Sequence, residues 1–160
     1  MTDQAAGQVD SIRQLQQAFF DRDLTAAATR LTGWFQARMP AARDLRISRI
    51  ETTGGLSTEL LSLDVDWRED GSERRLPLVL RIDPVRYRKR PQSALRREFD
   101  ILSLLSPFAD VPTPAVHWFE EDADVLGAQF FVMDRIDGNV PRDQPPYGSQ
   151  GWLAEMAPTE

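Results

Sequence analysis

Cysteine is absent from this sequence of 160 residues, and histidine and lysine occur once each, as His117 and Lys89. Without cysteine the chain has no disulfide framework, no thiolate metal ligand and no cysteine nucleophile. A single histidine excludes metal sites and acid–base pairs that need two. A buried anion, or one that carries phosphate, would therefore be bound mainly by arginine, because the planar guanidinium suits phosphate oxygens.

Long apolar runs are also missing. No segment approaches about 18 consecutive apolar residues, and the N-terminus lacks the basic-then-apolar pattern of a secretory signal. We therefore expect a soluble, cytoplasmic protein with no membrane partner. The length and the 41% hydrophobic content indicate one globular domain, with or without appendages.

Acidic residues outnumber basic ones by 25 to 19, and their distribution along the chain is uneven. Residues 1–97 carry 17 basic and 13 acidic side chains, a net charge of +4, whereas residues 98–160 carry 2 and 12, a net charge of −10. Seven basic side chains fall within residues 81–97. We interpret this segment either as a solvated basic loop or as a region that meets an anion such as phosphate. The negative total and the acidic C-terminal third disfavour a nucleic-acid partner.

Hydrophobic periodicity divides the chain into helices and strands. A helical period predicts three helices, at residues 9–20, 24–38 and 91–105. Alternation and short apolar runs predict five strands, at residues 46–53, 61–67, 76–82, 116–120 and 129–135. Asp23 is expected to cap the second helix and Pro40 to end it, and Pro77 suits the start of its strand rather than the centre. The order predicts an α+β fold: a five-stranded antiparallel sheet with one packed helix, preceded by N-terminal helices.

Three features of this layout could carry chemistry. A glycine turn at residues 53–58 can either fold its backbone N–H groups over phosphates or only close a hairpin. Alternation places Arg81 on the strand face opposite Leu80, where its charge needs a partner, an anion or solvent. Glu98 lies on the inward side of the third helix and can pair either with Arg81 or locally, for example with Arg97.

The order of these features is more informative than any one of them. A glycine turn between two strands, a cation on the third strand, an acid on the next helix and two further strands form the layout of a kinase-like N-terminal lobe. The sequence resembles the aminoglycoside phosphotransferase family, near the branch of the acyl-CoA dehydrogenase-linked phosphotransferases. The stretches that carry this resemblance are residues 54–58, 78–81, 97–102, 111–114 and 127–138.

The resemblance implies that one group of residues holds the phosphates of a nucleotide, which we call the phosphate side of the site. Gly54, Gly55 and Ser57 would belong to the loop that covers the nucleotide. Arg81 would stand where protein kinases have a lysine that holds the phosphates, and Glu98 would be its ion-pair partner. The implied cofactors are ATP and Mg²⁺, with the metal ligands expected in a lobe that this chain does not contain.

The resemblance also implies that a second group of residues binds the adenine base, which we call the adenine side of the site. Met133 would lie at the back of the adenine pocket. The backbone C=O of Asp134 and the backbone N–H of Ile136 would bond the adenine edge at a hinge. These two hinge roles would be independent of the side chains.

Beyond the hinge the sequence departs from the family. The family's catalytic His-Gly-Asp segment, its later Asn and its metal-binding Asp are absent, so the resemblance implies no catalytic residue and no metal ligand here. His117 lies on a predicted strand and is interpreted as a structural or surface histidine. We expect an N-terminal helical extension at residues 1–45, a kinase-like N-lobe at 46–138 and a linker toward a missing C-terminal lobe at 139–160.

Two functions are compatible with this layout. The first is the nucleotide-binding lobe of an ATP-dependent phosphotransferase that acts on a small-molecule hydroxyl, with the 160-residue chain inactive alone. The alternative is a non-catalytic, kinase-like interaction or binding module, which would self-associate through its uncovered inter-lobe face.

Overall fold

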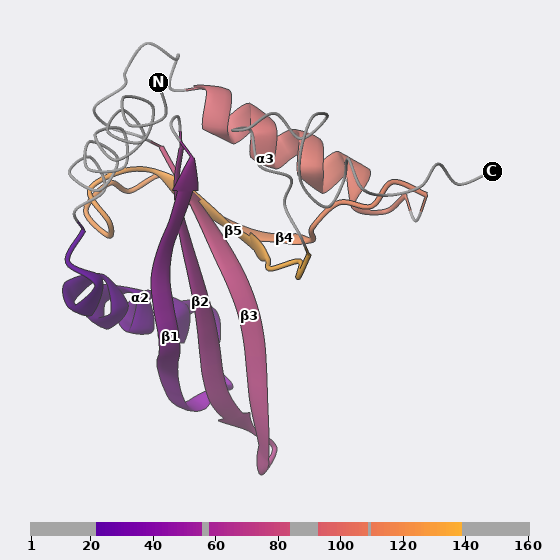
Figure 1. The fold of residues 1–160 in the computed structure, drawn as a ribbon. Coiled ribbons are helices and arrows are strands. Elements are labelled where there is room, and N and C mark those ends of the chain that lie inside the picture. Colours follow the sequence, from indigo (N-terminus) through magenta and orange to yellow (C-terminus); the bar gives the residue numbers. More distant parts are fainter. Residues whose placement is uncertain (1–21, 56–57, 84–92, 109, 139–160) are drawn as a thin grey trace, which may run out of the picture.

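The computed structural model describes residues 22–55, 58–83, 93–108 and 110–138, and its elements are drawn in Figure 1. They are α2 (Leu24–Arg38), β1 (Arg43–Gly55), β2 (Thr58–Glu69), β3 (Ser72–Ile82), α3 (Ser93–Leu105), β4 (Val116–Glu120) and β5 (Phe130–Asp134). The strands form one antiparallel sheet in the order β1-β2-β3-β5-β4. The predicted α+β fold with a five-stranded antiparallel sheet is therefore confirmed. The helix predicted at 9–20 and the linker predicted at 139–160 lie outside the described residues.

A two-residue turn, Asp70-Gly71, joins β2 to β3. The two residues have φ values of 50° and 77°, as the type I′ turn of a hairpin requires. Pairing begins at once beside the turn, where Glu69 lies opposite Ser72. β3 consequently starts at Ser72 and not at residue 76, because backbone pairing continues through polar residues that the hydrophobic pattern did not count.

Pro77 lies inside β3, not at its start. It is opposite Asp64 of β2, one residue before pairing with β5 begins at Leu78. Proline has no N–H to donate, so it is poorly suited to a strand that is paired on both sides. Its carbonyl accepts a hydrogen bond from the N–H of Arg135 at 3.1 Å. Pro77 thus marks the point where the three-stranded ribbon of β1, β2 and β3 enters the five-stranded sheet.

Helix α2 has the bounds that its sequence predicted. The carboxylate of Asp23 accepts hydrogen bonds from the N–H groups of Thr25 and Ala26, each at 3.0 Å, which is the expected N-cap. The helix ends at Arg38, two residues before Pro40. Local signals therefore suffice to place this element.

The core lies between α2 and one face of the sheet. Leu31 and Phe35 of α2 are fully buried there. They belong to one cluster with alternate residues of the three central strands, namely Leu61, Leu63, Val65, Leu78, Leu80, Ile82, Phe130 and Val132. Burial of this set removes the largest continuous apolar surface of the described chain from water and is the main stabilising term.

Polar contacts fasten α2 to β4 at the border of this core. Glu120 of β4 accepts hydrogen bonds from the indole of Trp34 and the guanidinium of Arg38, each at 2.6 Å. The Arg38 guanidinium also lies 3.7 Å from the centre of the Trp34 ring. Burial raises the pKa of Glu120, but the hydrogen bonds from Trp34, the Asp122 backbone and Arg38 outweigh it and hold the pKa below its ordinary value.

Helix α3 packs over β4 and β5 on the opposite face of the sheet, which we call the α3 face (Figure 1). Its Phe99 packs edge-on against Phe119 of β4 and Phe131 of β5, with ring centroids 5.5 and 5.8 Å apart. Since Phe130 faces α2 and Phe131 faces α3, β5 is buried on both sides. The described helices have 15 and 13 residues, and neither is long and apolar enough to cross a bilayer.

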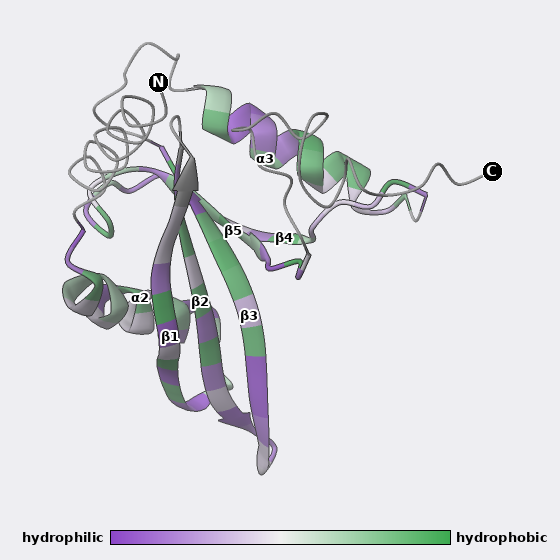
Figure 2. Ribbon diagram, viewed as in Figure 1, coloured by the Kyte–Doolittle hydropathy of each residue, from purple (hydrophilic) through white to green (hydrophobic). Residues whose placement is uncertain are grey.

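Beyond the helices β3 becomes hydrophilic toward the Asp70-Gly71 turn (Figure 2). Ion pairs replace apolar packing there. Asp66 accepts hydrogen bonds from Nε and Nη2 of Arg75 at 2.6 and 3.2 Å, and Nε of Arg46 lies 3.5 Å away. The hydrogen bonds from Arg75, ahead of the positive charges of Arg75 and Arg46, lower the pKa of Asp66 from 3.8 to about 2.

Strand β1 forms one edge of the sheet, and its pairing with β2 is irregular. The register shifts between Arg43 and Arg46 and again between Ile47 and Arg49. Asp44, within the first shift, has a φ of 53°, a left-handed conformation that few residues other than glycine, asparagine and aspartate adopt readily. The strand starts at Arg43, before the predicted residue 46, because the irregular segment still pairs with β2.

Phe35→Ala should lower the free energy of unfolding by about 3–5 kcal/mol, because it removes a fully buried ring and leaves a cavity against the sheet. Urea denaturation followed by circular dichroism measures the change. Arg30→Ala, on the exposed side of the same helix, is the control and should stay within about 0.5 kcal/mol of the unaltered chain. Equal losses in both variants would contradict the packing of α2.

Asp66→Asn should make the free energy of unfolding less sensitive to acid. The pKa of Asp66 is lower in the folded than in the unfolded chain, so its ion pair stabilises fully above about pH 4 and loses that effect as the pH falls through about 2. Because the Arg75 side chain is largely exposed to solvent, we expect a contribution of only about 1 kcal/mol. Urea midpoints measured near neutrality and in acid test this. Asp44→Asn, at an exposed acid 4.0 Å from Arg68, is the control; an acid response of Asp66→Asn parallel to that of the unaltered chain would refute the prediction.

Candidate functional site

Arg81 extends from the α3 face near the end of β3. Its neighbours Leu80 and Ile82 are buried in the α2 core, so alternation turns Arg81 to the other face, as predicted. In the register it lies between Leu60 of β2 and Phe131 of β5. Because α3 packs over Phe131, its side chains lie beside Arg81.

Glu98 of α3 meets Arg81 across this face. The Nε of Arg81 lies 3.0 Å from Oε2 of Glu98, and the two side chains are 26% and 37% exposed. Among the residues that the structure describes, Arg81 is the one ion-pair partner of Glu98. The structure therefore brings together the two residues whose pairing the sequence left open, and Glu98 turns to the strand and not to Arg97 of its own helix.

The same pair leaves one donor unused. The Nε of Arg81 is buried and donates no hydrogen bond to any described residue, since its N–H does not point at the nearby carboxylate. A buried N–H without an acceptor costs about 1–3 kcal/mol. The Arg81 side chain is still 26% exposed beside Glu98, so its other guanidinium N–H groups can meet an anion such as phosphate.

Gly54 and Gly55, the last residues of β1, pair with the start of β2. Gly54 lies opposite Glu59, which in turn lies opposite the last residue of β3. The two glycines are therefore at the same end of the sheet as Arg81. Ser57, the third residue expected in this turn, lies outside the described residues.

A buried ion pair holds the base of the glycine turn from the α2 side. Both carboxylate oxygens of Glu59 accept from Arg22, with Nε–Oε1 at 2.5 Å and Nη2–Oε2 at 2.9 Å. The Nη1 of Arg22 also donates to the carbonyl of Leu126 at 2.5 Å. One arginine thus ties together the segment before α2, the start of β2 and the loop before β5. No local sequence pattern signals this pair, because its residues are far apart in the chain.

The expected adenine side lies at the other end of the β3–β5 pairing. Met133 is half-buried and opposite Val79, so it shares the α3 face with Arg81. Asp134 is the last residue of β5. Ile136 follows it and is exposed. Met133 and Asp134 therefore end β5, and Ile136 lies two residues beyond that end.

Side-chain contacts at this hinge were not foreseen. The Nη1 of Arg135 donates to Oδ1 of Asp64 at 2.7 Å and to Oγ of Ser62 at 3.3 Å. Asp134 contacts Nε2 of His117 through Oδ1 at 2.6 Å, so the lone histidine is bound to the hinge. The side chains of Asp134 and Arg135 thus form contacts within the chain, although the resemblance implied a role only for the backbone at the hinge. One signal was available: Arg135 is one of only two basic residues in the acidic C-terminal third.

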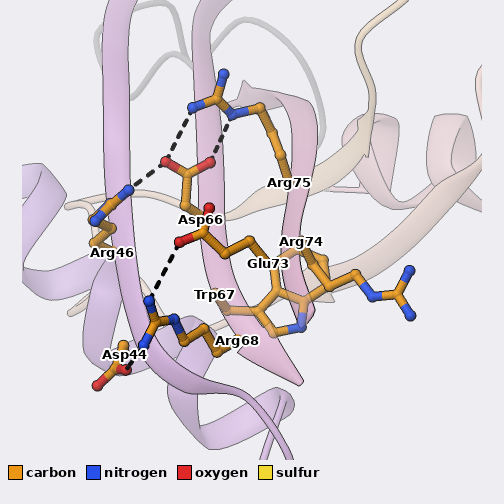
Figure 3. Close-up of a pocket in the computed structure, with 8 residues that line it drawn as sticks. All are labelled: Asp44, Arg46, Asp66, Trp67, Arg68, Glu73, Arg74 and Arg75. Atoms are coloured by element: carbon orange, nitrogen blue, oxygen red, sulfur yellow. Dashed lines mark hydrogen bonds and ion pairs between the residues drawn. The ribbon is translucent and has the colours of Figure 1, made fainter. Parts of the chain in front are cut away.

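A pocket at the tip of the ribbon is separate from this site (Figure 3). Its volume is about 510 Å³, and it is lined by Asp44, Arg46, Asp66, Trp67, Arg68, Glu73, Arg74 and Arg75. It shares no residue with the candidate nucleotide site. Each of its three acids lies within ion-pair distance of an arginine, so we interpret the pocket as the space between the ion pairs of the ribbon.

Comparison with known proteins gives a family and a related structure. A solved structure from Ralstonia eutropha, provisionally named an aminoglycoside phosphotransferase, is 25% identical to this chain, with a TM-score of 0.48. The alignment covers 72% of this chain and 30% of that one, so the chain spans less than a third of the length of that protein. The family model of the phosphotransferase enzyme family, APH, matches residues 61–158. Because this match covers more than half of the chain, from β2 through β5, the chain belongs to the phosphotransferase enzyme family.

Proposed function

We propose that this chain forms the nucleotide-binding lobe of an ATP-dependent phosphotransferase that acts on a small-molecule hydroxyl. The observation that carries the proposal is the Arg81–Glu98 pair, at the same end of the sheet as Gly54 and Gly55. Family membership supports phosphoryl transfer. The hydroxyl substrate and the activity of a whole protein are parts of the proposal, since the chain spans only 30% of the Ralstonia eutropha chain.

ATP, when bound, supplies the phosphoryl group. Arg81 neutralises charge on the phosphates, and Glu98 holds the guanidinium toward the nucleotide. The backbone of Gly54 and Gly55 would hold the phosphates, since no Cβ stands in the way. At the hinge, backbone groups of Asp134 and Ile136 orient the base. These residues position and stabilise, and the base that activates the acceptor hydroxyl is not among them.

The phosphate side of this proposal fits the chemistry of the residues present. The guanidinium of Arg81 is partly exposed beside Glu98, and its planar N–H groups suit phosphate oxygens. For the accompanying Mg²⁺ the described part of the chain offers no group of three His, Asp or Glu side chains. We therefore assign no metal ligand to these residues.

Arg81→Ala should weaken Mg-ATP binding by about tenfold or more, because hydrogen bonds to charged groups contribute about 1.5–3 kcal/mol. A titration followed by ¹H–¹⁵N correlation spectra measures dissociation constants into the millimolar range. Arg75→Ala is the matched control: an arginine on the same strand and the same face, but in the ribbon. Equal affinity of Arg81→Ala and Arg75→Ala would remove Arg81 from the site.

A second candidate function rests on the outer surface of α3. Leu104 and Ile101 are 71% and 49% exposed on the helix that carries Glu98. An apolar surface of this kind fits a non-catalytic module that self-associates through it.

Leu104→Lys should abolish self-association if this second function holds. Size-exclusion chromatography with light scattering over a wide concentration range measures the mass of the unaltered chain and of the variant. Thr29→Lys, at an exposed position of α2, is the control. A monomeric unaltered chain at all concentrations counts against the second candidate.

A further inference from the structure

Asp134 and Arg135, which follow the buried part of β5, form hydrogen bonds with the chain on opposite sides of that strand. The N–H of Asp134 donates to the carbonyl of Ala115 at 2.9 Å, and its carboxylate contacts His117, both on the β4 side. The N–H of Arg135 donates to the carbonyl of Pro77 at 3.1 Å on β3. The chain is thereby held from both neighbouring strands at the place where it leaves the sheet.

The His117 contact depends on an irregularity of β4. Val116 lies opposite Met133 and Trp118 opposite Val132, so His117 is the extra residue of a bulge. A bulge turns its side chain away from the regular alternation. Here it lets the imidazole reach the carboxylate of Asp134 at 2.6 Å.

Arg135 reaches farther, across a whole strand. Its backbone bonds Pro77 of β3, while its guanidinium binds Asp64 and Ser62 of β2, on the far side of β3. The side chains of Arg135 and Asp64 are only 20% and 12% exposed, so solvent screens this pair less than the pairs of the ribbon. The other acid within reach is Asp137, 3.6 Å from Nε of Arg135 and exposed.

The position of this contact separates it from the phosphate side. Arg135 is anchored beside Pro77, whereas Arg81 lies four residues farther along β3, about 13 Å away at the usual rise of a strand. Loss of the Arg135–Asp64 pair would therefore free the hinge without disturbing the Arg81–Glu98 pair. The two halves of the site can be tested independently.

We propose that Arg135, through its ion pair with Asp64, is a positioning residue that fixes the hinge backbone for recognition of an adenine base; this rests on the proposed function. The pair holds the C=O of Asp134 and the N–H of Ile136 at a fixed spacing, which lowers the conformational cost of binding the base. Affinity for the adenine base then depends on the carboxylate of Asp64 in β2, although Asp64 does not contact the base.

The experiment compares two probes, Mg-ATP and Mg-tripolyphosphate, by titration of the ¹⁵N-labelled chain. Arg135→Met and Asp64→Asn should each weaken Mg-ATP binding by about tenfold, and the double variant should be no weaker than the weaker single variant, because both remove one shared interaction. Binding of Mg-tripolyphosphate, which has no base, should be unchanged. Hydrogen exchange of the backbone amide at position 135, which donates to the carbonyl of Pro77, should become about tenfold faster in the same variants.

The control pair lies two residues away on the same strand. Asp66→Asn and Arg75→Met break an Arg–Asp pair of the same type on the same face, and they should leave the binding of both probes unchanged. If Arg135→Met does not give a folded spectrum, Arg135→Lys replaces it. The lysine keeps the charge but replaces the planar guanidinium with a more flexible and more strongly hydrated ammonium, so an intermediate loss of Mg-ATP affinity is expected.

Failure of this proposal can be distinguished from failure of the proposed function. If the unaltered chain binds neither probe, the proposed nucleotide site is wrong, and the present proposal with it. If the unaltered chain binds Mg-ATP and the Arg135 and Asp64 variants bind it equally well, only the positioning role is wrong. An equal loss for Mg-ATP and Mg-tripolyphosphate also overturns it, since that result would indicate a general loss of structure.

Discussion

The pairing of β3 with β5 is the contact on which the rest of the structure depends. β5 is the last strand of the described residues, yet it inserts between β3 and β4. Its side chains pack on both faces of the sheet. Phe130 belongs to the core with α2, and Phe131 packs against Phe99 of α3. The same pairing puts Arg81 near one end of the ladder and Asp134 at the other. Arg81 and Asp134, which are distant in sequence, thus lie near the two ends of one strand pairing.

Sequence patterns predicted the parts of this arrangement that local physics decides. The bounds of α2 follow from the Asp23 cap and an apolar stripe, and the face of Arg81 follows from strand alternation. The contact of Arg135 with Asp64 was not predicted, because it spans two strand pairings and leaves no periodic trace. The reach of His117 depends on a bulge, which shifts a side chain by one residue and cannot be read from composition.

Strand β2 shows how charge can be buried on a part of the α3 face that helix α3 does not cover. Ser62, Asp64 and Asp66 alternate with core residues and look like a solvent face in the sequence, yet all three are buried. Arginines from neighbouring strands cover them, Arg135 at the hinge and Arg75 in the ribbon. Paired guanidinium groups thus replace apolar side chains as the second layer, with carboxylates below. This layer favours one register, because slipping a strand would leave a buried acid unpaired.

The irregular edge strand β1 has a consequence for the behaviour of the protein at high concentration. A regular, unpaired edge is a template on which a second chain can add a strand. Among the described strands β1 is at the edge, and its two register shifts, the left-handed Asp44 and the charged Arg46 and Arg49 interrupt that template. An incoming strand would have to bury charges and would find no continuous row of backbone partners. The exposed border of the ribbon is therefore protected against ordered aggregation, even though β1 is one of the longest strands of the sheet.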